Sequence, residues 1–364
     1  MKYNEIRRKT SEVKVGNRTL GGNAPIAIQS MTNTDTADAA STTDQILRLE
    51  AAGCDIVRVS VPTAEAAYTI LKIKEAGVRI PIVADIHFDY RIALRCAELG
   101  FDKIRINPGN IGEDDRVRAV CDACRERKIP IRIGVNSGSL EKHILAKYGA
   151  PTPEALCESA LYHISLLERC GFYDTLVSIK ASTVPDMIRA NRLLAERCPY
   201  PLHLGVTEAG GGERGTLKSA IGIGALLCDG IGDTIRVSLT ENPLAEVAAA
   251  KKILQAVGIE GQSGMDIVSC PTCSRTKINL IALAAAFEKA VREAHLEDVP
   301  VRVALMGCVV NGPGEAREAD IGIAGGCGEA VLFRHGEIVE KIPEGEIVER
   351  LIREIRSFKE KGNS

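Results

Sequence analysis

The sequence predicts an α/β chain in which a (β/α)8 TIM barrel is followed by a smaller α+β domain. Between residues 26 and 257 one unit recurs: a helical pattern, a glycine, a polar residue and a short β-branched run, as in 52–60 and 99–107. Eight such units within about 230 residues are typical of a (β/α)8 barrel. The repeat stops at a glycine-rich segment, and a different order of strands and helices follows.

The barrel domain is predicted over residues 1–257. Residues 13–20 have the pattern of a hairpin that closes the barrel floor. Apolar β-branched runs that follow a helix-ending glycine are typical of buried parallel strands. Residues 41–44 match a capping box, and Thr152 precedes a proline at a first helical position. The predicted strands are 26–29, 56–60, 82–85, 103–107, 131–135, 176–180, 202–206 and 234–239.

The second domain is predicted over residues 265–364, after a linker at 258–264 that is rich in glycine. Its order differs from the barrel repeat, because strands here follow one another without a helix between each pair. The predicted elements are a strand at 266–269, a helix at 277–294, strands at 301–305 and 320–324, a hairpin of 330–333 and 337–341, and a final helix at 346–359.

Composition excludes several classes of protein. The 364 residues include 46 basic and 48 acidic side chains, no tryptophan and only 4% aromatic residues, which argues against nucleic-acid binding. No apolar run approaches the ~20 residues that span a membrane. The first residues lack the apolar stretch of a signal peptide. Twelve cysteines without a secretion signal indicate a reducing compartment, so we expect a cytoplasmic protein.

Three cysteines of the second domain have the pattern of a metal site. Cys270 and Cys273 flank a Pro-Thr turn, and Cys308 lies in a Gly-Cys-x-x-Asn-Gly-Pro-Gly stretch that disfavours a helix. They look like the ligands of an iron-sulfur cluster with one corner not held by thiolate. A closed zinc site is the main alternative and would need a fourth ligand, Cys327 or Glu315.

The other cysteines are interpreted as structural. Cys121 and Cys124 form a second Cys-x-x-Cys pair, but this pair lies in a charged, turn-free run with helical periodicity. Free cysteine is among the residue types most often buried in protein cores. We therefore expect this pair to pack in the core and to bind no metal.

Five predicted strands carry a basic residue between aliphatic neighbours. Because side chains alternate along a strand, the aliphatic residues are expected to face the helices and the cations to face the barrel interior. Buried unpaired charges are costly, so these cations need anions. Internal carboxylates such as Asp85, Asp174, Glu208 and Asp233 are one source. A diphosphate bound at the C-terminal strand ends is the preferred one. The five cations are Arg58, Arg105, Arg132, Lys180 and Arg236.

Further polar residues follow the same strand ends, where barrel active sites lie. Glu208 follows an apolar strand and opens a glycine-rich loop, a position suited to a general acid. His87 is either a second proton donor or a structural histidine. The other candidate substrate-binding residues are Asp85, Asn107, Asn136, Thr207 and Ser238.

Seven motifs together resemble the 4-hydroxy-3-methylbut-2-enyl diphosphate synthase family, iron-sulfur enzymes of the non-mevalonate isoprenoid pathway. They are Gln-Ser-Met-Thr-Asn at 29–33, Ala-Asp-Ile-His-Phe at 84–88, Arg-Ile-Asn-Pro-Gly-Asn at 105–110, Gly-Val-Asn-Ser-Gly-Ser at 134–139, Thr-Glu-Ala-Gly at 207–210, Ser-Cys-Pro-Thr-Cys at 269–273 and Cys-Val-Val-Asn-Gly-Pro-Gly-Glu at 308–315. The resemblance extends over essentially the whole chain. The chain resembles the compact bacterial form of the family, because it lacks the insert that plant-type members have between the domains.

The resemblance implies a [4Fe-4S] cluster bound by Cys270, Cys273, Cys308 and the carboxylate of Glu315. Oxygen is displaced more easily than thiolate, so Glu315 would leave one iron open to substrate. The resemblance also implies that the five barrel cations, together with Asn136, Thr207 and Ser238, bind the diphosphate of the substrate. Glu208 is the hypothesised proton donor.

The implied reaction is the reductive ring opening of 2-C-methyl-D-erythritol 2,4-cyclodiphosphate, with two electrons supplied by ferredoxin or flavodoxin. The implied assembly is a homodimer in which the cluster domain of one subunit closes the barrel of the other. Two alternatives stay open from the residues alone. One is a zinc-containing barrel hydrolase acting on a sugar phosphate, and the other is a non-catalytic cluster-bearing sensor.

Overall fold

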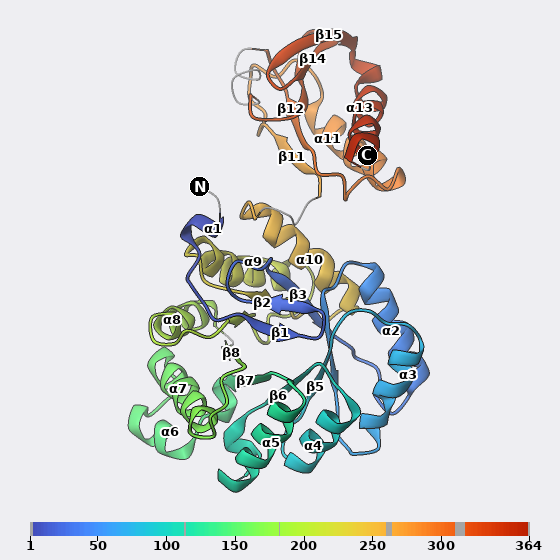
Figure 1. Ribbon diagram of the computed structural model, residues 1–364. Coiled ribbons are helices and arrows are strands. Elements are labelled where there is room, and N and C mark those ends of the chain that lie inside the picture. The colour runs from blue at the N-terminus through green and yellow to red at the C-terminus, as the bar shows by residue number, and fades with distance from the viewer. Residues whose placement is uncertain (1–2, 113, 182, 260–263, 310–316, 363–364) are drawn as a thin grey trace. The chain divides into compact units, whose positions relative to one another are not determined.

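The chain folds into two units. The computed structural model describes residues 3–112, 114–181, 183–259, 264–309 and 317–362. The units comprise Met1–Ile259 and Glu260–Ser364 (Figure 1). The predicted linker at 258–264 includes residues 260–263, which lie outside the described residues, so the linker stays a prediction.

The first unit is a closed barrel of eight parallel strands, as predicted. Each strand pairs with its neighbour in the chain from the first to the sixth, and the last pairs with both the seventh and the first. A parallel bridge between Val177 and Leu202 joins the sixth and seventh strands and completes the ring. The strands are β3 (Ala27–Met31), β4 (Ile56–Ser60), β5 (Ile82–Asp85), β6 (Lys103–Ile106), β7 (Ile131–Asn136), β8 (Thr175–Lys180), β9 (His203–Leu204) and β10 (Thr234–Ile235).

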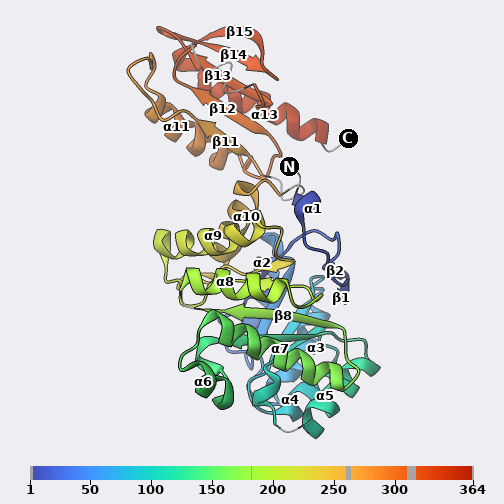
Figure 2. The ribbon, with the colours of Figure 1, turned by 90° about the vertical axis from the view of Figure 1, so that its left-hand side faces the viewer.

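Helices surround the barrel, and in the turned view of Figure 2 α7 and α8 lie along β8. Short α1 (Tyr3–Ile6) precedes the hairpin. The longer helices are α2 (Ala39–Ala51), α3 (Thr69–Glu75), α4 (Tyr90–Leu99), α5 (Asp114–Glu126), α6 (Lys142–Tyr148), α7 (Pro153–Arg169), α8 (Val184–Ala195), α9 (Gly212–Cys228) and α10 (Pro243–Ala256). Single 3-10 turns are η1 (Ala66–Tyr68), η2 (Pro108–Asn110) and η3 (Ser137–Ser139).

One of the two predicted helix starts is correct. Thr152 caps α7 and accepts a hydrogen bond from the backbone N–H of Ala155. The capping box predicted at 41–44 is wrong, because α2 begins at Ala39 and is capped by Asp38, whose carboxylate accepts from the N–H of Ser41. Aspartate is as good a cap as serine, and it stands three residues earlier in a run of cap-forming side chains.

Alternation along the strands builds two separate hydrophobic cores. Outward aliphatic residues such as Val57, Ile104 and Ile133 pack beneath the helices, together with Cys121 and Cys124 of α5, which are buried as predicted. At the barrel floor, inward residues pack against the hairpin of β1 (Val13–Val15) and β2 (Arg18–Leu20). This floor cluster contains Val13, Val15, Leu20, Ala27, Ile56, Val83 and Leu176.

In its described residues, the second unit is a five-stranded sheet with two helices. Its strand order is β11 (Asp266–Ser269), β12 (Arg302–Met306), β13 (Ile321–Gly325), β14 (Glu329–Arg334) and β15 (Glu337–Pro343). The first three strands are parallel and the last two pairings are antiparallel. Its helices are α11 (Leu280–Glu293) and, after a 3-10 turn η4 (Glu344–Glu346), α13 (Ile347–Gly362). Apolar residues of α11 and α13, among them Phe287, Leu351 and Ile355, pack in one cluster with the sheet.

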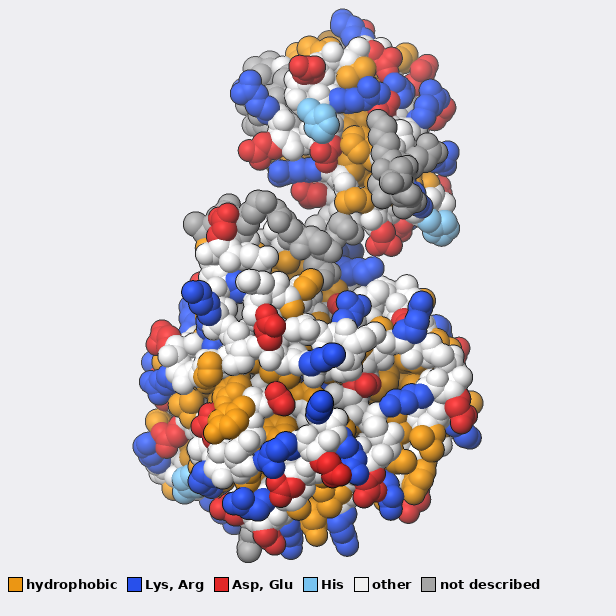
Figure 3. All heavy atoms as spheres, viewed as in Figure 1, with side chains coloured by type: hydrophobic (Ala, Val, Ile, Leu, Met, Phe, Trp, Pro, Cys, Tyr) orange, Lys and Arg blue, Asp and Glu red, His pale blue; other side chains and the backbone are white. Residues whose placement is uncertain are grey.

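The surface of both units is mixed in charge. On the face seen in Figure 3, Lys and Arg side chains are interspersed with Asp and Glu side chains. Within the described residues, no helix combines the length and the apolar composition needed to cross a membrane.

The segment after α1 is bound to the barrel by a buried ion pair. Arg7 Nη2 lies 2.8 Å from Asp233 Oδ1, and both side chains are buried. The other carboxylate oxygen of Asp233 accepts from the backbone N–H of Leu202 at 2.8 Å. Thr10 Oγ1 adds a contact of 3.3 Å. Asp233 therefore neutralises Arg7 and joins the start of the chain to the β9 region, and it does not pair with the interior cations.

We expect Asp233→Ala to lower the free energy of unfolding by about 3–5 kcal/mol, because it leaves a buried guanidinium without its partner. Urea denaturation measures the change. Glu349→Gln is the matched control, since its ion pair with Arg353 at 2.8 Å is exposed and its loss should cost less than about 0.5 kcal/mol. Equal effects of the two substitutions would contradict the prediction.

Candidate functional site

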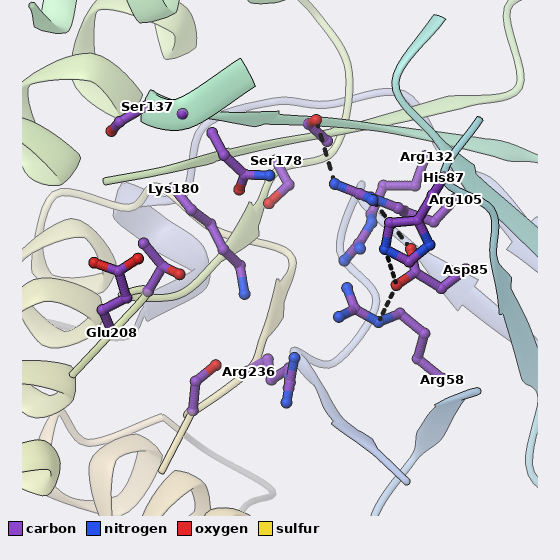
Figure 4. Close-up of a pocket in the computed structure, with 15 residues that line it drawn as sticks. Arg58, Asp85, His87, Arg105, Arg132, Ser137, Ser178, Lys180, Glu208 and Arg236 are labelled. Atoms are coloured by element: carbon purple, nitrogen blue, oxygen red, sulfur yellow. Dashed lines mark hydrogen bonds and ion pairs between the residues drawn. The ribbon is translucent and has the colours of Figure 1, made fainter. Parts of the chain in front are cut away.

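A polar cavity of about 520 Å³ opens at the C-terminal ends of the barrel strands. Basic side chains reach it from four strands and from Arg236, which directly follows β10, and polar residues of the following loops complete its wall (Figure 4). The lining residues are Arg58, Asp85, His87, Arg105, Arg132, Gly134, Asn136, Ser137, Gly138, Ser178, Lys180, Thr207, Glu208, Arg236 and Ser238.

The strand register explains why the cations converge. Asp85 on β5, Arg105 on β6 and Arg132 on β7 are partners in successive parallel ladders. Residues in register on neighbouring strands point to the same face of the sheet, so all three side chains enter the barrel. In Figure 4 the nitrogen-bearing ends of Lys180, Arg58 and Arg236 turn toward one shared space. The predicted inward orientation of the five cations is confirmed.

Two carboxylates neutralise part of this charge. Asp85 lies 3.1 Å from Arg105 and 3.7 Å from Arg58. Burial raises the pKa of Asp85, but Arg58, Arg105 and Arg132 outweigh burial and hold that pKa below its usual value. Glu246 on α10 lies 3.5 Å from Arg236 and accepts from Ser30 Oγ at 2.9 Å and from the N–H of Leu239 at 3.1 Å. Each carboxylate thus fixes the position of at least one arginine.

The remaining cations have no such partner. Among the described residues, no carboxylate lies within 4 Å of Arg132 or Lys180, and the Nε and Nη1 groups of buried Arg132 make no hydrogen bond. Burial, reinforced by neighbouring arginines, lowers the pKa values of Lys180 and Arg132 well below their usual range. Burial also lowers the pKa of Arg58 to about 10, although Asp85 opposes the shift. An anion bound in the cavity would stabilise the charged forms of these side chains and so raise their pKa values.

Two glycines make room for the cations. A Cβ at Gly134 on β7 would lie 2.5 Å from Arg105 Nε, so any side chain there would displace the guanidinium. A Cβ at Gly205, just after β9, would lie 2.7 Å from the carbonyl oxygen of Arg236 and 3.3 Å from Lys180 Nζ. Glycine at both places therefore permits the cations to share one cavity.

The candidate proton donors lie at the cavity wall. Glu208 is exposed and has a φ of 55°, a strained backbone conformation for a residue with a side chain. His87 is half exposed, and its Nε2 lies 3.9 Å from Asp85 Oδ2. In the view of Figure 4, Glu208 lies on the side opposite Asp85 and His87. A bound molecule would thus have an ionisable group on either side.

One predicted site residue lies outside this lining. Asn107 is buried, and its side chain accepts from the N–H of Gly109 at 3.3 Å, which caps η2. Asparagine at a strand end serves as a cap as readily as a ligand. A direct contact between Asn107 and substrate stays a prediction.

Sequence reasoning missed several residues of the site. Lys103 is fully buried and reaches Gln29 Oε1 at 3.4 Å. The sequence did offer a signal for Lys103. It lies two residues before Arg105 on the same strand, and because side chains alternate along a strand, both residues point into the barrel. Glu246 gave no signal, since its partner Ser30 is 216 residues away. Ser178 could have been found in the same way, because it lies two residues before Lys180 on β8 and therefore points into the barrel as well. Gly134, Ser137 and Gly138 belong to a motif but were not assigned a place in the cavity.

The three cysteines follow the strands of the second unit. Cys270 follows β11 and Cys308 follows β12, and the parallel pairing of these strands brings both cysteines to one edge of the sheet. The N–H of Gly307 donates to Cys270 Sγ at 3.3 Å. A Cβ at Gly307 would lie 2.7 Å from Thr276 Cγ2, and Thr276 Oγ1 in turn accepts from the N–H of Cys273 at 3.1 Å.

These contacts fit a thiolate-bound group, because N–H donors to sulfur stabilise its charge. Glu315 lies outside the described residues. Among those described, no three Cys, His, Asp or Glu side chains converge closely enough to hold a metal ion. The ligand set therefore stays a prediction. Cys327, the alternative fourth ligand of a zinc site, is exposed in the turn between β13 and β14.

Comparison with solved structures bears on the barrel alone. Dihydropteroate synthase from Stenotrophomonas maltophilia matches 68% of this chain and 98% of its own, with a TM-score of 0.50 and 14% identity. At that identity the likeness shows a shared fold.

Sequence relatives cover nearly the whole chain. Two relatives carry the name 4-hydroxy-3-methylbut-2-en-1-yl diphosphate synthase (flavodoxin). The protein from Caldanaerobacter subterraneus subsp. tengcongensis is 57% identical, over 97% of this chain and 98% of its own length. The protein from Geobacter sulfurreducens is 55% identical, over 97% of this chain and 99% of its own length. The family models of the GcpE TIM-barrel domain and the GcpE protein C-terminal domain match residues 10–251 and 266–357. The chain belongs to the GcpE family.

Proposed function

We propose that this chain is a 4-hydroxy-3-methylbut-2-en-1-yl diphosphate synthase, an oxidoreductase of isoprenoid biosynthesis. It would open the ring of 2-C-methyl-D-erythritol 2,4-cyclodiphosphate and remove one hydroxyl as water, with two electrons supplied from outside. The observation that carries the proposal is the cavity at the barrel's C-terminal end, where buried cations outnumber carboxylates. The names of the relatives support the same reaction. They lend no support to a zinc hydrolase or a sensor.

The cation excess suits a cyclic diphosphate. Arg132 and Lys180 have charges that no carboxylate of the described residues balances, and Arg58, Arg105 and Arg236 each retain donors beyond those used by Asp85 and Glu246. Each charge-assisted hydrogen bond to a phosphate oxygen contributes roughly 1.5–3 kcal/mol. Asn136, Thr207 and Ser238 line the same wall and offer neutral polar groups to the remaining oxygens.

The second unit would hold an iron-sulfur cluster of the [4Fe-4S] type. Cys270, Cys273 and Cys308 would supply thiolates, and Glu315 would supply a carboxylate oxygen at the fourth iron. The donor of Gly307 to Cys270 Sγ supports this assignment, because such bonds stabilise a thiolate. When bound, the cluster would deliver the two electrons one at a time and offer one iron to a substrate oxygen.

Glu208 would give its proton to the departing hydroxyl. It lines the cavity wall on the side opposite Asp85 and His87, and its backbone has a strained φ of 55°. Asp85 is unsuited to this role, because the three arginines lower its pKa and keep it ionised. His87 is the alternative donor.

The external partners follow from the relatives. Flavodoxin is the proposed electron donor, because it stands in their names, and ferredoxin is the alternative. We further propose a cytoplasmic homodimer in which the cluster domain of one subunit closes the barrel of the other. This arrangement rests on the resemblance described above.

We expect anaerobically purified protein to be brown, to contain one four-iron cluster, and to convert the cyclic diphosphate with reduced flavodoxin. Cys308→Ser should lose the cluster's visible absorption and all turnover, because it removes a thiolate ligand. Cys228→Ser is the control, since Cys228 is exposed at the end of α9 and should leave colour and turnover unchanged. Zinc instead of iron in the wild-type protein would contradict the proposed iron-sulfur cluster. A coloured and active Cys308→Ser variant would contradict the assignment of Cys308 as a ligand.

We expect Glu208→Gln to retain the cluster and the affinity for the cyclic diphosphate but to lower kcat by roughly 100- to 10,000-fold, the range for loss of a general acid. Single-turnover kinetics and calorimetry separate the two quantities. Glu213→Gln on the first turn of α9 is the control for an exposed carboxylate nearby. Unchanged kcat would remove Glu208 from the mechanism and leave His87 as the candidate.

We expect diphosphate affinity to fall as pH rises above neutral. Burial lowers the pKa of Lys180 in the empty cavity, and a bound diphosphate favours its charged form, so binding at higher pH must recruit a proton. Lys180→Gln should weaken binding at pH 7 by roughly 10- to 150-fold and flatten the pH dependence. Calorimetry measures both, with exposed Lys72→Gln as the control. A Lys180→Gln variant that keeps the wild-type pH profile would refute the explanation.

A further inference from the structure

A histidine-glutamate pair, with a buried imidazole and a partly exposed carboxylate, lies beside the loops that follow β6 and β7. His163 on α7 is fully buried, and its Nε2 lies 2.5 Å from Glu141 Oε1. Burial raises the pKa of Glu141, but the adjacent imidazole of His163 outweighs burial and lowers it. The Glu141 side chain is only 13% exposed, so loss of this partner would be costly. Neither residue lines the substrate cavity, so the pair requires a different explanation.

The turn after β6 packs directly on this pair. A Cβ at Gly109 would lie 2.8 Å from His163 Cε1, 3.4 Å from Glu141 Oε1 and 3.6 Å from Asn107 Oδ1. The Asn107 side chain accepts from the N–H of Gly109, which closes the turn. The imidazole therefore sets how far the turn can approach α7, and glycine is needed at 109 because a methyl group would overlap the ring.

The loop after β7 is fixed by the same pair. Asn136, Ser137 and Gly138 line the substrate cavity, and Glu141 follows three residues later at the N-cap position of α6. Glu141 makes no cap hydrogen bond with its side chain, which turns instead to His163. The cavity-lining segment thus runs between β7 and a carboxylate that is held by the buried His163.

On its other side, Glu141 borders a second cavity that is separate from the substrate cavity. Glu141, Asp114 and Asp115 line this second cavity of about 550 Å³ together with His143 and other residues. Among the described residues, His163 is the ion-pair partner of Glu141.

We propose that Glu141 and His163 are positioning residues of the substrate cavity. They hold the 107–110 turn and the 136–141 loop at a fixed separation, so that Asn136 and its neighbours meet the bound diphosphate. The proposal rests on the proposed function, because it concerns the same cavity. Misplacement of contact groups by about 1 Å can cost on the order of 100-fold in activity. The pair is therefore expected to act on substrate affinity and not only on stability.

The test measures the affinity of the whole iron-loaded protein for 2-C-methyl-D-erythritol 2,4-cyclodiphosphate, together with its Tm. Glu141→Gln and His163→Gln should each weaken binding by at least about tenfold. The double variant should weaken binding no more than the worse single variant, because both remove one unit. Glu158→Gln is the matched control, because the exposed ion pair between Glu158 and Lys147, at 2.6 Å, joins the same two helices, α6 and α7. This variant should bind the cyclic diphosphate as tightly as the wild-type protein does.

Gly109→Ala covers the case in which the pair variants fail to fold. It leaves both side chains of the pair unchanged and moves only the turn, and the φ of Gly109 lies outside the left-handed region, so alanine can adopt this backbone conformation. It too should weaken binding. Wild-type affinity in folded Glu141→Gln and His163→Gln, or in Gly109→Ala, would overturn the proposal. Failure of the wild-type protein to bind the cyclic diphosphate would instead overturn the proposed function.

Discussion

The excess of buried positive charge at one end of the barrel is the constraint on which the rest of this structure depends. Arg58, Arg105 and Arg236 have carboxylate partners, whereas Arg132 and Lys180 have none among the described residues. Removing charges from water costs several kcal/mol each when no counter-charge replaces the water. The interior is therefore organised around an anion, and its features follow: glycines where guanidinium groups need space, two carboxylates that orient arginines, and an open polar wall.

Stability comes from other parts of the same barrel. Aliphatic residues that face outward pack beneath the helices, and the floor is sealed by the β1–β2 hairpin against inward residues of four strands. Most of the destabilised groups lie in the upper interior, where a ligand is expected to compensate them, and the exception is Lys103, which is in register with Val83 of the floor cluster. This division between a stable floor and a strained, charged top is common in barrel enzymes and matches the strained backbone of Glu208.

Support for the site extends one layer beyond the cavity wall. Glu246 connects Arg236 to Ser30 and to the backbone of Leu239, and the His163–Glu141 pair underlies two loops at the strand ends. In the second unit, Gly307 and Thr276 perform a comparable task, because they bring backbone and hydroxyl groups to the cysteine segments. Residues of this kind position those that meet the ligand, and their chemistry is visible only in their contacts.

The sequence by itself determined the barrel class, most strand positions, the inward orientation of the five cations and the cysteine segments. All of these depend on local periodicity or on turn-forming residues, which neighbouring residues specify. Only the tertiary structure decided that β8 and β9 close the barrel and that Asp38 and not Ser41 caps α2. It also decided that Asn107 caps its own turn, and that Glu246 and His163 support the residues of the cavity. These depend on contacts between distant segments, such as the 216 residues that separate Ser30 from Glu246, and no local pattern encodes such a contact.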